Sequence, residues 1–279
     1  MKSTLILILV VLFSIGAFAQ TDNSKLNLSE NSGYRTYDVT KQSPDIQSEK
    51  EKDFSFAINP YLWTAATGGY AGLPNTMEYA FNLKFTDAVK DLQFAAMVAG
   101  RFQYKPVSLM YDVTYLKLKP ELSIPVTNTG GYITGSSEFE QFVGDFSLGY
   151  RIPIRDKSVQ LDCYGGVRVW SLSNTINLTT PGGVTESYSS SKTFVDPILG
   201  AFANFDFEKK WFTYLRGDIG GFGVASDFTS VFMWGIGYKF NEHWNTSFGI
   251  KSLYTNYDQE KIIWDVWQTG LLLSVGYRL

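Results

Sequence analysis

The stretch from Arg216 to Thr229, RGDIGGFGVASDFT, holds the residues whose types and spacing most invite a chemical interpretation. It begins with the adhesion tripeptide Arg-Gly-Asp, and the glycines that follow are crowded as in a loop that cradles phosphate. A phosphate loop needs a helix N-terminus directly after its glycines. The residues that come next, SVFMWGIGYKF, alternate in the manner of a strand. This pattern excludes the phosphate loop and predicts one end of a β-strand.

Residues suited to acid–base or nucleophilic catalysis are scarce. His243 is the only histidine, and it is expected in a short solvated turn beside Trp244. Barrel enzymes rely on histidine as a base that titrates near neutral pH. The sequence shows no Ser/His/Asp set and no metal-ligand cluster, and Cys163, the only cysteine, excludes an internal disulfide. We therefore predict no enzymatic activity and no cofactor.

The N-terminal 53 residues divide into two segments that precede the fold. Residues 1–19 carry Lys2, an apolar run and a small-x-small site, which is the order of a cleavable secretory signal. The apolar run is shorter than the roughly 20 residues of a spanning helix, so cleavage is favoured over a membrane anchor. Residues 20–53 are polar and lack a period. They are predicted to be a disordered periplasmic lead segment rather than a plug.

The composition narrows the class of protein. The formal charge is -3, or -4 once Lys2 is removed, and such acidity excludes nucleic acid as a partner. Aromatic residues make up 16%, charged residues only 18%, and there are 25 glycines. An exported β-barrel has this composition, although a secreted β-sandwich is also compatible with it.

From residue 54 onward the hydrophobic period is 2, which predicts strands. Short and long connections alternate between the strands, as in an antiparallel up-and-down transmembrane barrel with both termini in the periplasm. A short helix is expected within residues 85–92, and residues 77–85 leave eight or twelve strands open as alternatives to ten. The ten predicted strands cover residues 54–66, 92–104, 107–118, 138–151, 158–171, 192–207, 210–220, 227–240, 243–255 and 264–279.

Alternation alone does not say which face of the barrel is inside. The polar face consists of Gly, Ser, Asn, Gln and Thr with few Lys or Glu, whereas a soluble surface is usually about 25–35% charged. This favours an apolar face toward lipid, with a soluble exported lipid-binding barrel as the alternative. Aromatic residues near the strand ends are expected to form girdles at the membrane interface, namely Tyr104, Tyr150, Tyr238, Trp267 and Tyr277.

The polar face carries charges of both signs into the lumen. Seven cations and six carboxylates are predicted to face inward: Arg101, Arg151, Arg168, Arg216, Lys239, Lys251 and Arg278 with Asp112, Asp145, Asp162, Asp196, Asp218 and Asp265. The predicted lumen network comprises Arg101, Asp112, Asp145, Arg168, Asp196, Arg216, Asp218, Lys239 and Asp265. The nearly equal numbers of cations and carboxylates favour a narrow or side-chain-filled lumen over a selective pore. The same numbers are equally compatible with several of these charges being solvated at the mouths of the barrel.

Within that network the Arg-Gly-Asp tripeptide acquires a different meaning. Arg216 and Asp218 share one face of their strand, so both point into the lumen, where no receptor reaches them. Asp196 and Lys239, on the flanking strands, are the partners expected for them.

Four segments resemble those of small Gram-negative outer-membrane β-barrels related to the OmpW and OmpA-like barrel proteins. They are RGDIGGFGVASDFT, FVDPILGA (194–201), YGGVRVWSL (164–172) and INPYLW (58–63). The resemblance covers residues 54–279 and implies the fold and a location in the outer membrane, in contact with its lipid, but no reaction. A structural or interaction role is thus predicted, with a narrow channel for small solutes as the alternative.

Overall fold

The computed structural model describes residues 54–72, 78–126, 131–180, 182–207, 210–259 and 262–279. The predicted signal and lead segments, 1–19 and 20–53, lie outside these residues. No helix in the described ranges is long and apolar enough to cross a membrane.

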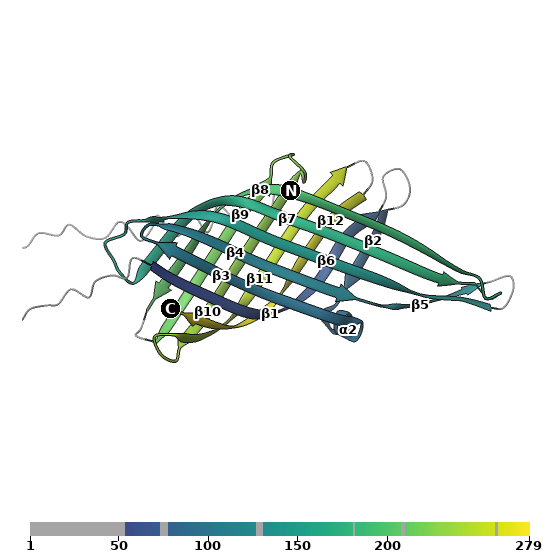
Figure 1. The fold of residues 1–279 in the computed structure, drawn as a ribbon, viewed down its shortest axis with the longest axis horizontal. Coiled ribbons are helices and arrows are strands. Elements are labelled where there is room, and N and C mark those ends of the chain that lie inside the picture. Colours follow the sequence, from purple (N-terminus) through teal and green to yellow (C-terminus); the bar gives the residue numbers. More distant parts are fainter. Residues whose placement is uncertain (1–53, 73–77, 127–130, 181, 208–209, 260–261) are drawn as a thin grey trace, which may run out of the picture. The chain divides into compact units, whose positions relative to one another are not determined.

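A closed antiparallel barrel of ten strands forms the fold, as predicted (Figure 1). Consecutive wall strands are hydrogen-bonded to each other, and β12 pairs with β1 to close the ring. The closure excludes a sandwich. The wall strands are β1 (Phe54–Gly72), β3 (Leu92–Tyr104), β4 (Val107–Leu118), β6 (Gly131–Ile152), β7 (Val159–Thr179), β8 (Thr185–Asp206), β9 (Trp211–Gly221), β10 (Phe228–Lys239), β11 (Trp244–Gln259) and β12 (Ile262–Arg278).

Two further strands and a helix are attached to this wall. β2 (Glu78–Leu83) pairs with the end of β1, and β5 (Glu121–Val126) pairs with the beginning of β6. The helix α2 (Phe85–Lys90) lies between β2 and β3, within the region where a short helix was predicted.

The helix interrupts the pairing between β1 and β3. Residues 61–66 of β1 are paired with β12 only, and residues 92–97 of β3 are paired with β4 only. At this seam the backbone amide of Trp63 donates to Sδ of Met97 at 3.3 Å. A thioether therefore replaces the carbonyl that a continuous ladder would supply.

The strands β6, β7 and β8 continue beyond the barrel as a sheet extension, at the right of Figure 1. Residues 172–179 of β7 pair with residues 185–192 of β8, and both segments are rich in Ser and Thr. The pairing of β8 with β9 begins only at Ile198. The first part of β8 is thus a free edge of the extension.

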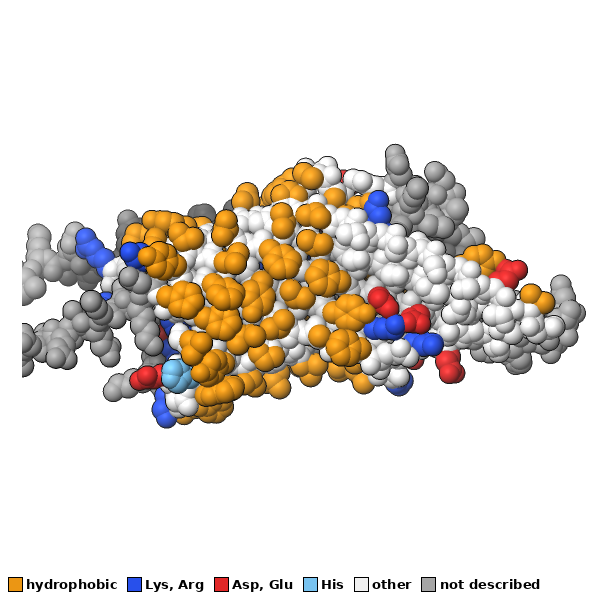
Figure 2. Space-filling view, in the orientation of Figure 1, with side chains coloured by type: hydrophobic (Ala, Val, Ile, Leu, Met, Phe, Trp, Pro, Cys, Tyr) orange, Lys and Arg blue, Asp and Glu red, His pale blue; other side chains and the backbone are white. Residues whose placement is uncertain are grey.

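The outer face of the barrel is apolar and the inner face is polar, as the composition of the two faces predicted. On β12, Leu273 is 53% exposed whereas its neighbour Ser274 is 7% exposed. Figure 2 shows hydrophobic side chains gathered over the barrel and a mostly polar surface over the extension. A soluble barrel would have the opposite arrangement, so the alternative of a soluble lipid-binding barrel was wrong.

Aromatic side chains lie at both borders of this apolar belt. Tyr104, Tyr150, Tyr238 and Tyr277 lie at the end where β1 begins and β12 ends, and Trp267 lies toward the other end. From Trp267 to Tyr277 there are ten residue steps (277 − 267) along β12. At about 3.3 Å per residue and a tilt of about 40°, these steps span roughly 25 Å, the height of the apolar band in membrane barrels.

The orientation of the faces predicts unequal tolerance to charge at two adjacent positions. Leu273→Arg should impair assembly, because arginine toward lipid costs about 2–4 kcal/mol at the midplane. Ser274→Arg should assemble, because Ser274 lines a lumen cavity. The fraction of protein with heat-modifiable mobility on detergent gels measures assembly. Equal tolerance at both positions would contradict the orientation.

Candidate functional site: the lumen charge network and its cavity

The centre of the lumen is occupied by six ionised side chains that contact one another. Arg168 on β7 is fully buried and forms a two-pronged pair with Asp145 on β6, at 2.7 Å and 2.9 Å. The same guanidinium reaches Asp218 on β9 at 2.8 Å and the hydroxyl of Thr229 at 2.9 Å. Two-pronged pairing fixes the plane of the guanidinium, so Arg168 is held rigidly.

Arg216, from the Arg-Gly-Asp tripeptide, joins three carboxylates. It lies 2.6 Å from Asp145, 3.0 Å from Asp112 and 3.0 Å from Asp218. Its Nε donates to the hydroxyl of Tyr164 at 3.0 Å. Both charges of the tripeptide are therefore directed into the lumen, away from any external receptor.

Lys251 on β11 completes the network from the opposite wall. Its ammonium lies 2.8 Å from Asp112 on β4 and donates to the hydroxyl of Tyr61 at 2.8 Å. Tyr61 in turn donates to Asp112 at 2.5 Å. These contacts join strands on opposite sides of the barrel, and the network balances three cations, Arg168, Arg216 and Lys251, against Asp112, Asp145 and Asp218.

A layer of apolar side chains fills the lumen on the extension side of the network. Trp170 is two residues beyond Arg168 on β7 and is stacked on Phe194, with ring centroids 5.9 Å apart. Phe194 is stacked on Tyr257 at 4.2 Å. Trp63 and Trp264 belong to the same buried cluster. Sequence reasoning missed this layer, although Trp170 shares the parity of Arg168 on its strand.

The loop between β9 and β10 folds over this end of the lumen. Ser226 is buried and donates both its amide and its hydroxyl to Asp196, at 2.7 Å and 2.6 Å. Gly221 and Gly223 have φ values of 87° and 74°, a conformation that favours glycine. The glycines of the opening motif thus permit a tight inward loop.

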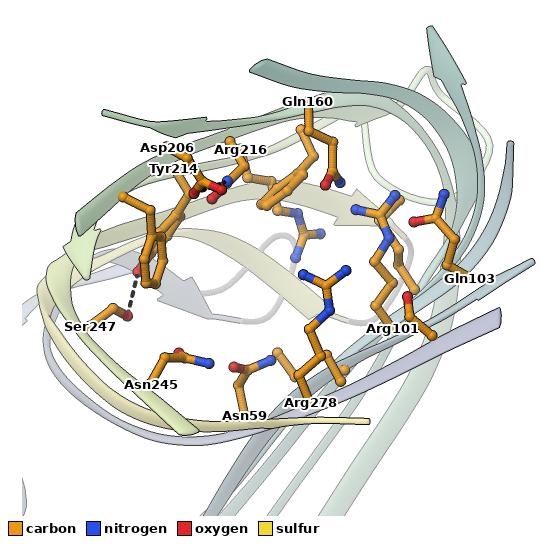
Figure 3. A pocket seen from close by; sticks show the side chains of 18 of the residues that line it. Asn59, Arg101, Gln103, Gln160, Asp206, Tyr214, Arg216, Asn245, Ser247 and Arg278 are labelled. Atoms are coloured by element: carbon orange, nitrogen blue, oxygen red, sulfur yellow. Dashed lines mark hydrogen bonds between the residues drawn. The ribbon is translucent and has the colours of Figure 1, made fainter. Parts of the chain in front are cut away.

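The other end of the lumen, where β1 begins and β12 ends, contains a cavity of about 790 Å³. Figure 3 shows Arg101, Arg216 and Arg278 extending into it. Arg101 pairs with the buried Asp162 at 2.6 Å, and Nε of Arg151 lies 3.4 Å from the same carboxylate. Asp112, Asp145 and Arg216 of the network line the inner end of this cavity, which is called the terminal-end cavity below.

The structure places the remaining predicted residues as follows. Asp265 lies on the outer face, because it has the parity of the exposed Trp267, so its prediction as a lumen charge was wrong. Neither Asp196 nor Lys239 is a partner of Arg216 or Asp218: Asp196 binds Ser226, and Lys239 pairs with Asp206 at 2.7 Å. The position of a residue in the alternation along its strand gives the face on which it lies, but not its partner across the lumen.

His243 and possible metal ligands can be placed too. His243 lies in the turn between β10 and β11, where Nδ1 of its ring lies 2.8 Å from the carbonyl oxygen of Arg278. Among the described residues, no group of three or more His, Cys, Asp and Glu side chains is arranged to hold a metal ion.

Comparison with known proteins gave structural similarities only. No known family and no curated protein matches the sequence. The attachment protein Ail of Yersinia pestis, crystallised with a heparin analogue, has a TM-score of 0.37 and 13% identity, covering 81% of this chain and 98% of that chain.

Two other solved barrels are similar to a comparable degree. The translocator domain of the autotransporter NalP from Neisseria meningitidis has a TM-score of 0.42 and 12% identity, covering 81% of this chain and 89% of its own. The P. putida toluene transporter TodX has a TM-score of 0.34 and 10% identity, covering 81% and 90%. At these scores no functional argument follows from the likeness.

The burial of Arg168 predicts that the network contributes strongly to stability. Arg168→Met should lower the free energy of unfolding by about 3–5 kcal/mol, because Asp145 and Asp218 lose a buried partner. Lys117→Met is the matched control, since Lys117 pairs with Glu140 on the exposed outer side and such pairs contribute little. Urea unfolding in detergent measures both variants. Equal stability of the two would show that the network is not a stabilising unit.

Proposed function

We propose that this protein is an outer-membrane barrel with a closed lumen and a structural or interaction role, exported by cleavage of residues 1–19. The double obstruction of the lumen is the observation that carries the proposal. A balanced charge network crosses the barrel, and stacked aromatic side chains fill the section next to it. A channel would need a continuous polar path, often with charges of one sign.

The sheet extension is the part proposed to contact the exterior. In membrane barrels the short turns face the periplasm and the long hairpins face outward. The beginning of β1, the end of β12 and the short turns lie at the opposite end of the barrel from the extension (Figure 1). The Ser- and Thr-rich extension and the free edge of β8 would then lie outside the cell. An unpaired strand edge can accept a strand from a partner.

A closed lumen predicts no stable conductance in planar bilayers. Arg216→Ala should also remain closed, because the aromatic layer does not depend on Arg216. Discrete and reproducible conductance steps of the unmodified protein would favour the second candidate function, a narrow passage for small solutes. That candidate is supported by the terminal-end cavity, which already opens part of the lumen.

The proposed orientation predicts which positions an external reagent can reach. In a Cys163→Ser background, Ser187→Cys in the extension should react with a membrane-impermeant maleimide on intact cells. Lys157→Cys, in the short turn between β6 and β7, should react only after the outer membrane is permeabilised. The reverse pattern would contradict the orientation, and labelling of neither site in membranes but of both in the soluble fraction would contradict the location.

A further inference from the structure

We propose that the terminal-end cavity binds an organic anion that carries a carboxylate or phosphate group on a small apolar body. The proposal concerns the cavity alone and does not depend on whether the barrel conducts or on what the extension contacts. It rests on a cluster of three arginines with one carboxylate, on a guanidinium group without an ion-pair partner in the ranges that the structure describes, and on the apolar part of the cavity wall.

Three guanidinium groups outside the network line the cavity, and two of them pair with one buried carboxylate. Asp162 is fully buried and is shared by Arg101 at 2.6 Å and Arg151 at 3.4 Å. Arg278, which Figure 3 shows directed into the cavity, forms no ion pair within the described part of the chain. Three cations against one carboxylate leave this cluster with a net charge of +2 (3 − 1), and a bound anion would lower their mutual repulsion.

Most other carboxylates that line the cavity are already engaged. Glu242 lines it together with Lys157, and these two opposite charges leave the net charge unchanged. Asp206 at the rim is already paired with Lys239 at 2.7 Å. Asp156 accepts from the amide and hydroxyl of Ser158 in its own turn, at 2.9 Å and 2.7 Å. On the inner wall, Asp112 and Asp145 are bound by Arg216 and by the other cations of the network.

Donor groups remain available among the arginines. Nη2 of Arg101 binds both Asp162 and Ser108, whereas the buried Nε has no hydrogen-bond partner among the described residues. Guanidinium groups match carboxylate and phosphate in geometry because they offer parallel N–H bonds. Asn59 and Asn245 line the same region, and their amide groups can donate further hydrogen bonds (Figure 3).

The remaining walls of the cavity are largely apolar. They include Ala99, Phe202, Phe212, Met233 and Leu272. The volume of about 790 Å³ lies within the range of roughly 300–1,000 Å³ typical of small-molecule sites. An inorganic ion alone would leave most of this volume and the apolar wall unused, so an anion with an apolar body fits better.

Isothermal titration of the full-length barrel in a non-ionic detergent tests the proposal, with phenyl phosphate as the probe. Benzyl alcohol supplies the ring without the charge, and inorganic phosphate supplies the charge without the ring. Phenyl phosphate should bind at least about tenfold more tightly than either, because only it uses both parts of the cavity. Equal affinity for benzyl alcohol would overturn the anion site, and equal affinity for inorganic phosphate would overturn the apolar body.

Variants locate the binding in the cavity. Arg278→Gln should weaken phenyl phosphate binding about tenfold, the effect of one charge-assisted contact. Arg155→Gln makes the same change in charge in a neighbouring turn, at a residue that does not line the cavity, and should leave binding unchanged. Equal binding by these two variants, or no binding by the unmodified protein, would overturn the proposal.

A second variant keeps the test independent of the folding of Arg278→Gln. Ala99→Phe fills the cavity from β3 without changing charge, and it should abolish binding while the heat-modifiable mobility is retained. Unchanged binding by folded Ala99→Phe protein would place the probe elsewhere and overturn the site. Micelles doped with phosphatidic acid distinguish the source of the anion: competition supports a lipid headgroup in this site, and its absence supports a soluble anion in the same site.

Discussion

Backbone hydrogen bonding inside a bilayer is the constraint on which the rest of this structure depends. No water is available there to satisfy an unpaired amide or carbonyl group, so a spanning sheet must close on itself. The pairing of β12 with β1 provides that closure. Because side chains alternate along every closed strand, one strand must supply both the lipid-facing and the lumen-facing surface, as Leu273 and Ser274 do. Charged residues at the level of the belt are thereby directed inward, into a narrow space bounded by protein.

The central charge network follows from that confinement. Ionised groups removed from water are costly unless each is paired and hydrogen-bonded. The network meets this condition with equal numbers of cations and carboxylates, and with contacts between residues as distant in sequence as Asp112 and Lys251. It also specifies register: a slip of one residue on β7 would direct Arg168 toward lipid and the apolar Val167 or Val169 into the lumen. The network therefore selects one closed arrangement in addition to filling the lumen.

The sequence predicted the strands and their inward faces, which depend on a period of 2. It did not predict which residues contact each other across the lumen, because those contacts depend on position around the barrel. The bounds 92–104 and 107–118 agree with β3 and β4, and the inward faces of these strands were also predicted. The partners of Arg216 could not be obtained, because alternation does not say which residues meet across the lumen. The strands β2 and β5 lack enough residues for a distinct period. The alternation along each strand gives the correct face for both Asp265 and Trp170. Asp265 was nevertheless assigned to the lumen because it is charged, and Trp170 was overlooked because aromatic residues were considered only for the girdles.

The two ends of the lumen have different physical character. On the extension side, the stacked rings of Trp170, Phe194 and Tyr257 exclude water, and the loop held by Ser226 and Asp196 covers them. At the other end, the same barrel leaves a cavity that contains the cluster of Arg101, Arg151 and Arg278. A solute entering from this side meets guanidinium groups first and the balanced network behind them. The network offers no net charge to draw an anion further, as we would expect if the cavity is the proposed binding site rather than the first half of a channel.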